Sequence, residues 1–157
     1  MDRGQFIEHV KDSQKAVRRF LTALCCGDSS LADDLAQDTF VKAYLSCDGF
    51  RGDSKFSTWI YRIAYNTFMS HRRSLKVYEP IDAAQCVSSR KHTDSAFEYQ
   101  ELYCALSRLS EKERSAILLY YMQGYSINEI AVINGSTPDA VKQQLSRGRQ
   151  HLKGILS

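Results

Sequence analysis

The stretch that decides the fold is residues 126–152, SINEIAVINGSTPDAVKQQLSRGRQHL. Ser126, followed three residues later by Glu129, is the pattern of a capping box, so we expect a helix to begin there. An Asn-Gly pair then tolerates the left-handed backbone that ends a helix, and a Thr-Pro pair favours an immediate restart. The stretch therefore predicts two short helices around a tight turn.

The second of these helices has two different faces. Small and apolar residues recur at helical spacing on one side, at Val141, Leu145, Gly148, Leu152 and Ile155. The other side carries Lys142, Gln143, Ser146, Arg147 and Arg149. Side chains of these types read base edges and phosphates in a major groove, so the pattern indicates a helix-turn-helix. An ordinary helical hairpin with a solvated polar face remains the alternative.

The length of the chain and the distribution of its apolar residues favour a protein that does not enter a membrane. A chain of 157 residues has room for one medium domain or two small ones. No apolar run approaches the roughly 20 residues that span a bilayer, and the first residues lack the apolar segment of a secretion signal. We therefore expect a cytoplasmic protein without membrane insertion.

Charge is unevenly distributed along the chain. Residues 28–48 are acidic, whereas residues 51–76 and 137–157 are basic. Two separated basic stretches indicate two contacts with a polyanion such as nucleic acid.

Residues that carry catalysis or bind metals form no recognisable pattern. The five cysteines and four histidines do not have metal-ligand spacing, and we expect reduced thiols. The sequence also lacks a Gly-rich phosphate loop, paired catalytic carboxylates and a nucleophile triad. We therefore expect no cofactor, no metal and no enzymatic activity.

Helical periodicity covers nearly the whole chain. It predicts helices over residues 2–24, 30–48 and 57–75, and further helices from residue 94 onward. Ser57 is expected to cap the third helix, with Phe56 and Tyr61 forming a hydrophobic staple. Residues 76–93 lack periodicity and predict a flexible linker. The expected fold is all-α, with two small helical domains at residues 1–75 and 94–157.

The third helix is unusual in its composition. Residues 50–73, FRGDSKFSTWIYRIAYNTFMSHRR, interleave aromatic and basic side chains. Aromatic rings stack on unpaired bases at about 1–3 kcal/mol per base, and cations follow the backbone, so a melted strand would suit this helix. Burial in the core is the favoured alternative for Trp59, Ile60, Ile63 and Phe68. The side chains that are harder to bury, and expected on the opposite face, are Tyr65, Asn66, Arg72 and Arg73.

Two blocks of the chain together resemble one family. Residues 31–44, LADDLAQDTFVKAY, and the aromatic stretch after them resemble the promoter-melting domain of bacterial extracytoplasmic-function sigma factors. Residues 109–156 are similar to the C-terminal helix-turn-helix domain of the same family. The resemblance implies a subunit of the RNA polymerase holoenzyme that directs promoter recognition and DNA melting.

The resemblance also implies roles for three sets of residues. The clamp of the polymerase's largest subunit would be contacted by Asp33, Asp34, Gln37, Asp38 and Lys42. The unpaired strand of the −10 element would be held by Trp59, Arg62, Tyr65, Asn66, Ser70, Arg72, Arg73 and Ser74. The −35 element would be read as duplex by Thr137, Lys142, Gln143, Ser146, Arg147 and Arg149. Further implied partners are promoter DNA, the flap of the second-largest polymerase subunit and an anti-sigma factor.

Two other functions remain open at this point. A stand-alone dimeric helix-turn-helix regulator would bind a palindromic duplex site, but it gives the aromatic third helix no role. A DNA-processing enzyme would need a catalytic cluster that the sequence lacks. Gln143 and Gln144 are adjacent, and Gln pairs with adenine edges, so no known promoter sequence is transferred from the family.

Overall fold

The computed structural model describes residues 1–50, 52, 55–78 and 99–156, and these residues form helices and no strand. In chain order the helices are α1 (Arg3–Leu24), α2 (Ser29–Ser46), α3 (Phe56–Tyr78), α5 (Gln100–Ser107), α6 (Glu111–Ile117), α7 (Ile127–Asn134) and α8 (Pro138–Leu156). A 3₁₀ turn, η1 (Cys47–Gly49), follows α2, and a π-helical turn, η3 (Leu118–Met122), continues α6. The predicted all-α fold is confirmed.

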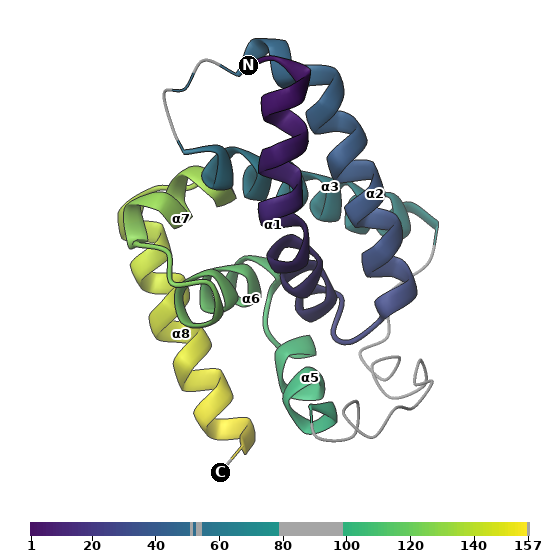
Figure 1. The fold of residues 1–157 in the computed structure, drawn as a ribbon. Helices are drawn as coiled ribbons and strands as arrows, with labels where there is room; N and C mark the ends of the chain where they lie inside the picture. Colours follow the sequence, from purple (N-terminus) through teal and green to yellow (C-terminus); the bar gives the residue numbers. More distant parts are fainter. Residues whose placement is uncertain (51, 53–54, 79–98, 157) are drawn as a thin grey trace.

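The first three helices form the N-terminal domain. Figure 1 shows α1 and α2 side by side, with α3 crossing both. The side chain of Asp2 caps α1 by accepting from the Gln5 N–H at 2.8 Å. The helix ends where Cys26 and Gly27 both take positive φ, which turns the chain back toward α2.

The starts of two helices in this domain differ from those predicted. Asp28 caps α2 by accepting from the Leu31 N–H at 3.1 Å, so the helix begins at Ser29 instead of Ser30. The third helix begins at Phe56, which places Ser57 inside it. Phe56 therefore precedes no cap, and the predicted staple is wrong. Its ring instead packs against neighbouring rings at 5.6–6.1 Å, those of Phe6, Phe50 and Trp59.

The predicted linker is described only at its beginning. Residues 76–78 continue α3 as helix. The remainder of the predicted linker, and the first residues of the helix expected from residue 94, lie outside the described residues.

The C-terminal domain consists of α5 to α8. The capping box predicted at Ser110 is present, because its hydroxyl accepts from the Glu113 N–H at 3.2 Å and its own N–H donates to the Glu113 carboxylate at 3.2 Å. The π-helical turn after α6 was not predicted. It ends before Gly124, whose φ of 76° reverses the chain.

The helix-turn-helix has the two helices and the tight turn that the sequence indicates, and Ser126 provides one of the two hydrogen bonds of the predicted capping box. The hydroxyl of Ser126 accepts from the Glu129 N–H at 3.2 Å and begins α7. Gly135 ends that helix in the left-handed region, with φ of 62°. The hydroxyl of Thr137 then accepts from the Ala140 N–H at 3.1 Å, which caps α8.

The two domains pack directly against each other. The third helix lies against α7, and α1 lies against α6 and η3, as the arrangement in Figure 1 shows. Buried side chains from both domains, including Phe20, Tyr61 and Leu119, belong to one continuous core. This packing decides which face of α3 is accessible. None of the described helices combines the length and apolar composition that crossing a bilayer requires.

Candidate nucleic-acid interface

The recognition helix, α8, turns its predicted contact face to solvent. Its inner face buries Val141, Leu145 and Gly148 against the domain core. A Cβ added to Gly148 would lie 2.8 Å from the Ile117 side chain, so α6 and α8 approach closely there. All six residues expected to read duplex DNA are exposed: Thr137, Lys142, Gln143, Ser146, Arg147 and Arg149.

Two glutamines of α8 differ from the sequence-based expectation: Gln150 was not named, and Gln144 does not lie on the outward face beside Gln143. Gln144 lies at the flank of the inner face, where its side-chain oxygen is buried and finds no partner among the described residues. Gln150 is exposed and lies about two helical turns beyond Gln143, on the same face. The exposed glutamines on this face are therefore Gln143 and Gln150, which are seven residues apart.

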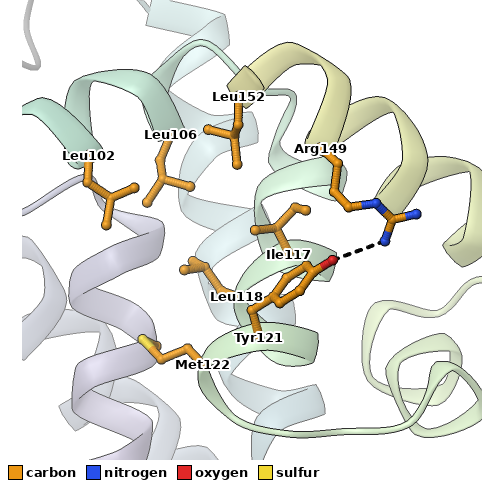
Figure 2. A pocket seen from close by; sticks show the side chains of 8 residues that line it. All are labelled: Leu102, Leu106, Ile117, Leu118, Tyr121, Met122, Arg149 and Leu152. Atoms are coloured by element: carbon orange, nitrogen blue, oxygen red, sulfur yellow. Dashed lines mark hydrogen bonds between the residues drawn. The ribbon is translucent and has the colours of Figure 1, made fainter. Parts of the chain in front are cut away.

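Arg149 lies at the border between the recognition face and an apolar pocket. Its Nη1 donates to the hydroxyl of Tyr121 at 3.2 Å, as the dashed line in Figure 2 marks. This bond draws the guanidinium toward η3. Arg149, a member of the predicted duplex set, thus also lines this pocket.

The pocket has a volume of about 460 Å³ and is almost entirely apolar. Figure 2 shows side chains from α5, the end of α6, η3 and α8 meeting around it. The lining residues are Leu102, Leu106, Ile117, Leu118, Tyr121, Met122, Arg149 and Leu152. Leu102, Tyr121 and Met122 remain exposed at its rim. An open apolar hollow of this kind is suited to the apolar face of a partner helix.

The third helix presents one polar and basic stripe to solvent. The exposed side chains are Arg62, Asn66, Ser70, Arg73 and Ser74, which recur every three or four residues. A guanidinium N–H of Arg73 donates to the Ser70 hydroxyl at 3.1 Å. The exposed part of the predicted −10 set therefore lies together along one side of the helix.

The remaining three members of that set are covered to different degrees. Tyr65 is only 3% exposed, so our expectation that it is hard to bury is wrong. Burial, followed by the nearby Glu111 carboxylate, raises the pKa of Tyr65 to about 12. Nε of Arg72 bonds Oε1 of Glu111 at 3.2 Å. Trp59 is partly buried, with its ring 5.0 Å from that of Phe50.

Core packing explains the other apolar positions of α3. Ile60 and Phe68 are buried, as the favoured interpretation predicted, and Ile63 is partly buried. The third helix also packs against α7 of the C-terminal domain, which begins far along the sequence.

The second helix exposes every residue expected to contact polymerase: Asp33, Asp34, Gln37, Asp38 and Lys42. Asp33 accepts from Arg18 at 3.0 Å, and Lys42 donates to the Thr67 hydroxyl at 3.3 Å. Two apolar residues of the same helix were missed, since Val41 is 57% and Leu45 76% exposed. The signal that could have identified them is that both are apolar but lie outside the buried stripe of the helix.

The described cysteines show no sign of a reactive or metal-binding site. Cys25, Cys26 and Cys47 are free thiols. Burial raises the pKa of Cys25 to about 12 and also raises that of Cys26, which disfavours the reactive thiolates. Three or more metal-ligating side chains do not gather anywhere in the described residues.

Comparisons with known proteins match both domains. Sigma-70 region 2 matches residues 9–77, and sigma-70 region 4 matches residues 99–152. The chain is 30% identical over 158 residues to the ECF RNA polymerase sigma factor SigM of Mycobacterium tuberculosis, covering 99% of this chain and 79% of that protein. The chain belongs to the ECF RNA polymerase sigma factors. The sigma factor is also 32% identical over 142 residues to SigW of Bacillus subtilis, covering 81% of this chain and 76% of that protein.

Two solved structures share the fold. The sigma factor RpoE, crystallised with the anti-sigma factor NepR from Bartonella quintana, superposes with a TM-score of 0.81 and 28% identity over 97% of this chain and 96% of that one. CnrH, in complex with the cytosolic domain of CnrY, gives a TM-score of 0.75 at 24% identity, over 99% and 89% of the two chains. Since the first superposition spans both domains, RpoE and this sigma factor also share the relative placement of their domains.

Proposed function

We propose that this sigma factor binds core RNA polymerase and directs promoter recognition by holding duplex DNA with α8 and an unpaired strand with α3. The observation that carries the proposal is that these two helices, far apart in sequence, each expose a polar and basic stripe. Both stripes lie within regions that match sigma-70 domains. The chain acts by binding, and polymerase performs the chemistry.

The recognition helix is suited to the −35 element in its duplex form. An α-helix fits the major groove, where Arg pairs with guanine edges and Gln with adenine edges. Arg147, Gln143 and Gln150 are exposed on α8 and have these side chains. Lys142 would contact phosphate, and such a contact positions the helix without reading sequence.

The exposed stripe of α3 is suited to the unpaired strand of the −10 element. Arg62 and Arg73 would follow its phosphates, and Asn66 lies between them for base contact. Opening the duplex costs a few kcal/mol per extruded base, and contacts to the freed bases return a similar amount. Capturing the strand would therefore shift the equilibrium toward the open promoter.

The exposed face of α2 is the proposed contact with the clamp of the largest polymerase subunit. Asp34, Asp38, Val41 and Leu45 recur at helical spacing, so acidic and apolar side chains share this face. An apolar centre beside charged residues is the composition of a specific protein interface. The sigma factor would work in the cytoplasm, where polymerase and DNA are found.

The apolar pocket is the proposed site for the flap of the second-largest polymerase subunit. A short amphipathic helix could place its apolar side chains between Leu102, Leu118 and Met122. An anti-sigma factor is the other proposed partner, since RpoE and CnrH were both crystallised with protein partners, RpoE with the anti-sigma factor NepR and CnrH with the cytosolic domain of CnrY.

In vitro transcription tests the proposal directly. Core polymerase and genomic DNA fragments are incubated with and without the sigma factor, and start sites are mapped. New start sites that share an upstream sequence support the proposal, and their absence contradicts it. Tight duplex binding by the sigma factor alone would favour the dimeric regulator instead.

Core binding is tested separately with two exposed apolar residues. Leu45→Glu, on α2, is expected to weaken binding to core polymerase at least about tenfold, a change of about 1.4 kcal/mol. Ile7→Glu, on α1, is the matched control because Ile7 is also exposed but lies outside the proposed face. Equal losses of affinity for core polymerase in both variants would show that this face of α2 is not part of the interface.

A further inference from the structure

The floor of the apolar pocket in the C-terminal domain consists of buried aliphatic side chains, those of Leu106, Ile117 and Leu118. Its volume of about 460 Å³ falls within the range of about 300–1,000 Å³ that is usual for small-molecule sites. Such sites are mostly apolar and contain a few polar groups that orient the ligand. The pocket therefore has the size and the lining to receive the apolar part of a small ligand.

A polar pair lies at one edge of this pocket. Nη1 of Arg149, on α8, donates to the hydroxyl oxygen of Tyr121, on η3, at 3.2 Å. Figure 2 shows this pair on one side of the pocket and the side chains of Leu102 and Leu106 on the other. A ligand that spans the pocket would thus meet hydrogen-bond donors at one end and aliphatic side chains at the other.

The positive charge of Arg149 is not neutralised within the described part of the chain. Its one hydrogen bond there is to the neutral Tyr121, and no carboxylate of the described residues forms an ion pair with it. The other N–H groups of the guanidinium can therefore donate to an incoming anion. A guanidinium binds the two oxygens of a carboxylate through charge-assisted hydrogen bonds. Charge complementarity at this edge favours a ligand with one carboxylate.

We propose that the pocket is a binding site for a monocarboxylate with an unbranched apolar tail, a medium-chain fatty acid. Its head group bonds Arg149 and Tyr121, and its tail lies over Leu106, Ile117 and Leu118. The site goes beyond the proposed function, because it requires neither polymerase nor DNA. Since the same pocket is the proposed flap site, a bound acid would exclude the flap helix, and this consequence alone rests on the proposed function.

Calorimetric titration of the full chain with decanoate tests the site. The acid is used below the concentration at which it forms micelles and at about pH 8, where its carboxylate is ionised. One saturable site is expected. Octanoate, which lacks two methylenes, is expected to bind about fourfold more weakly for each one lost. Absence of saturable binding, or an affinity that is independent of tail length, would overturn the proposal.

Two arginine variants test the contact with the head group. Arg149→Met keeps the apolar length and removes the charge, and it is expected to weaken decanoate binding about three- to tenfold, a modest loss because the contact faces solvent. Arg108→Met is the matched control, since Arg108 is also exposed but does not line the pocket. Octanol, which is neutral, should bind both variants as it binds the wild-type chain. Equal losses of decanoate affinity in both variants would contradict the head-group contact.

A second pair of variants tests the pocket independently of Arg149. Met122→Glu places a negative charge at the rim of the pocket and is expected to weaken decanoate binding at least about tenfold through repulsion and lost apolar contact. Val132→Glu adds the same charge at an exposed apolar residue of α7, outside the pocket. Equal affinities of the two variants for decanoate would show that the acid binds elsewhere, and the proposal would fail.

Vesicles of phosphatidylglycerol distinguish a free acid from a membrane lipid, which also combines an anionic head group with an apolar tail. Co-sedimentation measures binding of the wild-type chain and of Arg149→Met to the vesicles. Dependence on Arg149 is expected with decanoate and not with vesicles. The reverse result would assign the pocket to a membrane lipid and overturn the proposal.

In vitro transcription with core polymerase distinguishes failure of this site from failure of the proposed function. If the wild-type chain directs initiation but does not bind decanoate, only the fatty-acid site is rejected. If it binds decanoate through Arg149 but directs no initiation, the proposed function fails and the site stands.

Discussion

Arg114 of the C-terminal domain donates from Nη1 to the carbonyl oxygen of Leu24, the last residue of α1, at 2.6 Å. The same guanidinium donates from Nε to the Leu106 carbonyl at 2.9 Å and from Nη2 to the Leu109 carbonyl at 3.3 Å. Carbonyls at the ends of helices have no partner within the helix, and their dipoles favour a nearby cation. The Arg114 side chain, which is 4% exposed, therefore donates hydrogen bonds to backbone carbonyls of both domains.

Replacing Arg114 tests this role. Arg114→Met keeps the length of the side chain but removes a donor from three carbonyls, of which that of Leu106 still accepts from the Leu109 N–H at 3.1 Å. Hydrogen bonds to charged groups contribute about 1.5–3 kcal/mol each, and the losses are not additive, so the free energy of unfolding should fall by about 2–4 kcal/mol. Urea unfolding followed by circular dichroism measures it. Arg108→Met, at an exposed arginine, should change it by less than about 1 kcal/mol; similar losses for both would contradict the assignment.

Two tyrosines of α3 should respond in opposite directions to loss of the hydroxyl. Tyr61→Phe removes a donor to Gln123 and should lower the free energy of unfolding by about 1 kcal/mol. Tyr65→Phe removes a buried hydroxyl that lacks a partner in the described residues, and should raise it by about 1 kcal/mol. Each variant is the control for the other in urea unfolding. The predicted opposite responses would be disproved if Tyr65→Phe lowered the free energy of unfolding as much as Tyr61→Phe does.

Local signals predicted the parts of the fold that local chemistry determines. Ser110 and Ser126 cap the helices that they were expected to cap, and Gly135 has the left-handed backbone that the turn requires. The burial of Tyr65 could not be predicted in this way, since α3 also packs against the C-terminal domain, whose helices come much later in the chain. Nothing in the spacing around Tyr65 distinguishes solvent from such a neighbour.

In the candidate site, too, the sequence predicted the features that local helical periodicity determines. The outward face of α8 follows from helical periodicity, and all six residues expected there are exposed. Gln150 was missed because the predicted contacts ended at Arg149, although periodicity continues. Leu45 was missed because an exposed leucine is common and carries little signal alone.

The close approach of α6 and α8 depends on a glycine. A Cβ at Gly148 would meet the Ile117 side chain at 2.8 Å, so Gly148→Ala should lower the free energy of unfolding by about 1–3 kcal/mol through overpacking. Gly154→Ala is the control on the same helix, where a Cβ meets nothing within 4 Å. It should raise stability by up to about 1 kcal/mol through helix propensity. Thermal unfolding of both variants measures the contrast, and a stabilising Gly148→Ala would rule out the tight contact.

Three variants of α8 test the orientation of the recognition helix on promoter DNA. Arg147→Ala and Gln150→Ala each remove an exposed side chain from the recognition face, and each should weaken holoenzyme binding to duplex promoter DNA by about 1–3 kcal/mol if a base contact is lost. Gln144→Ala is the control, because Gln144 lies at the flank of the inner face and should leave promoter affinity unchanged. Quantitative footprinting of the −35 region measures all three. If Gln144→Ala weakens binding while Gln150→Ala does not, α8 enters the groove with a different face.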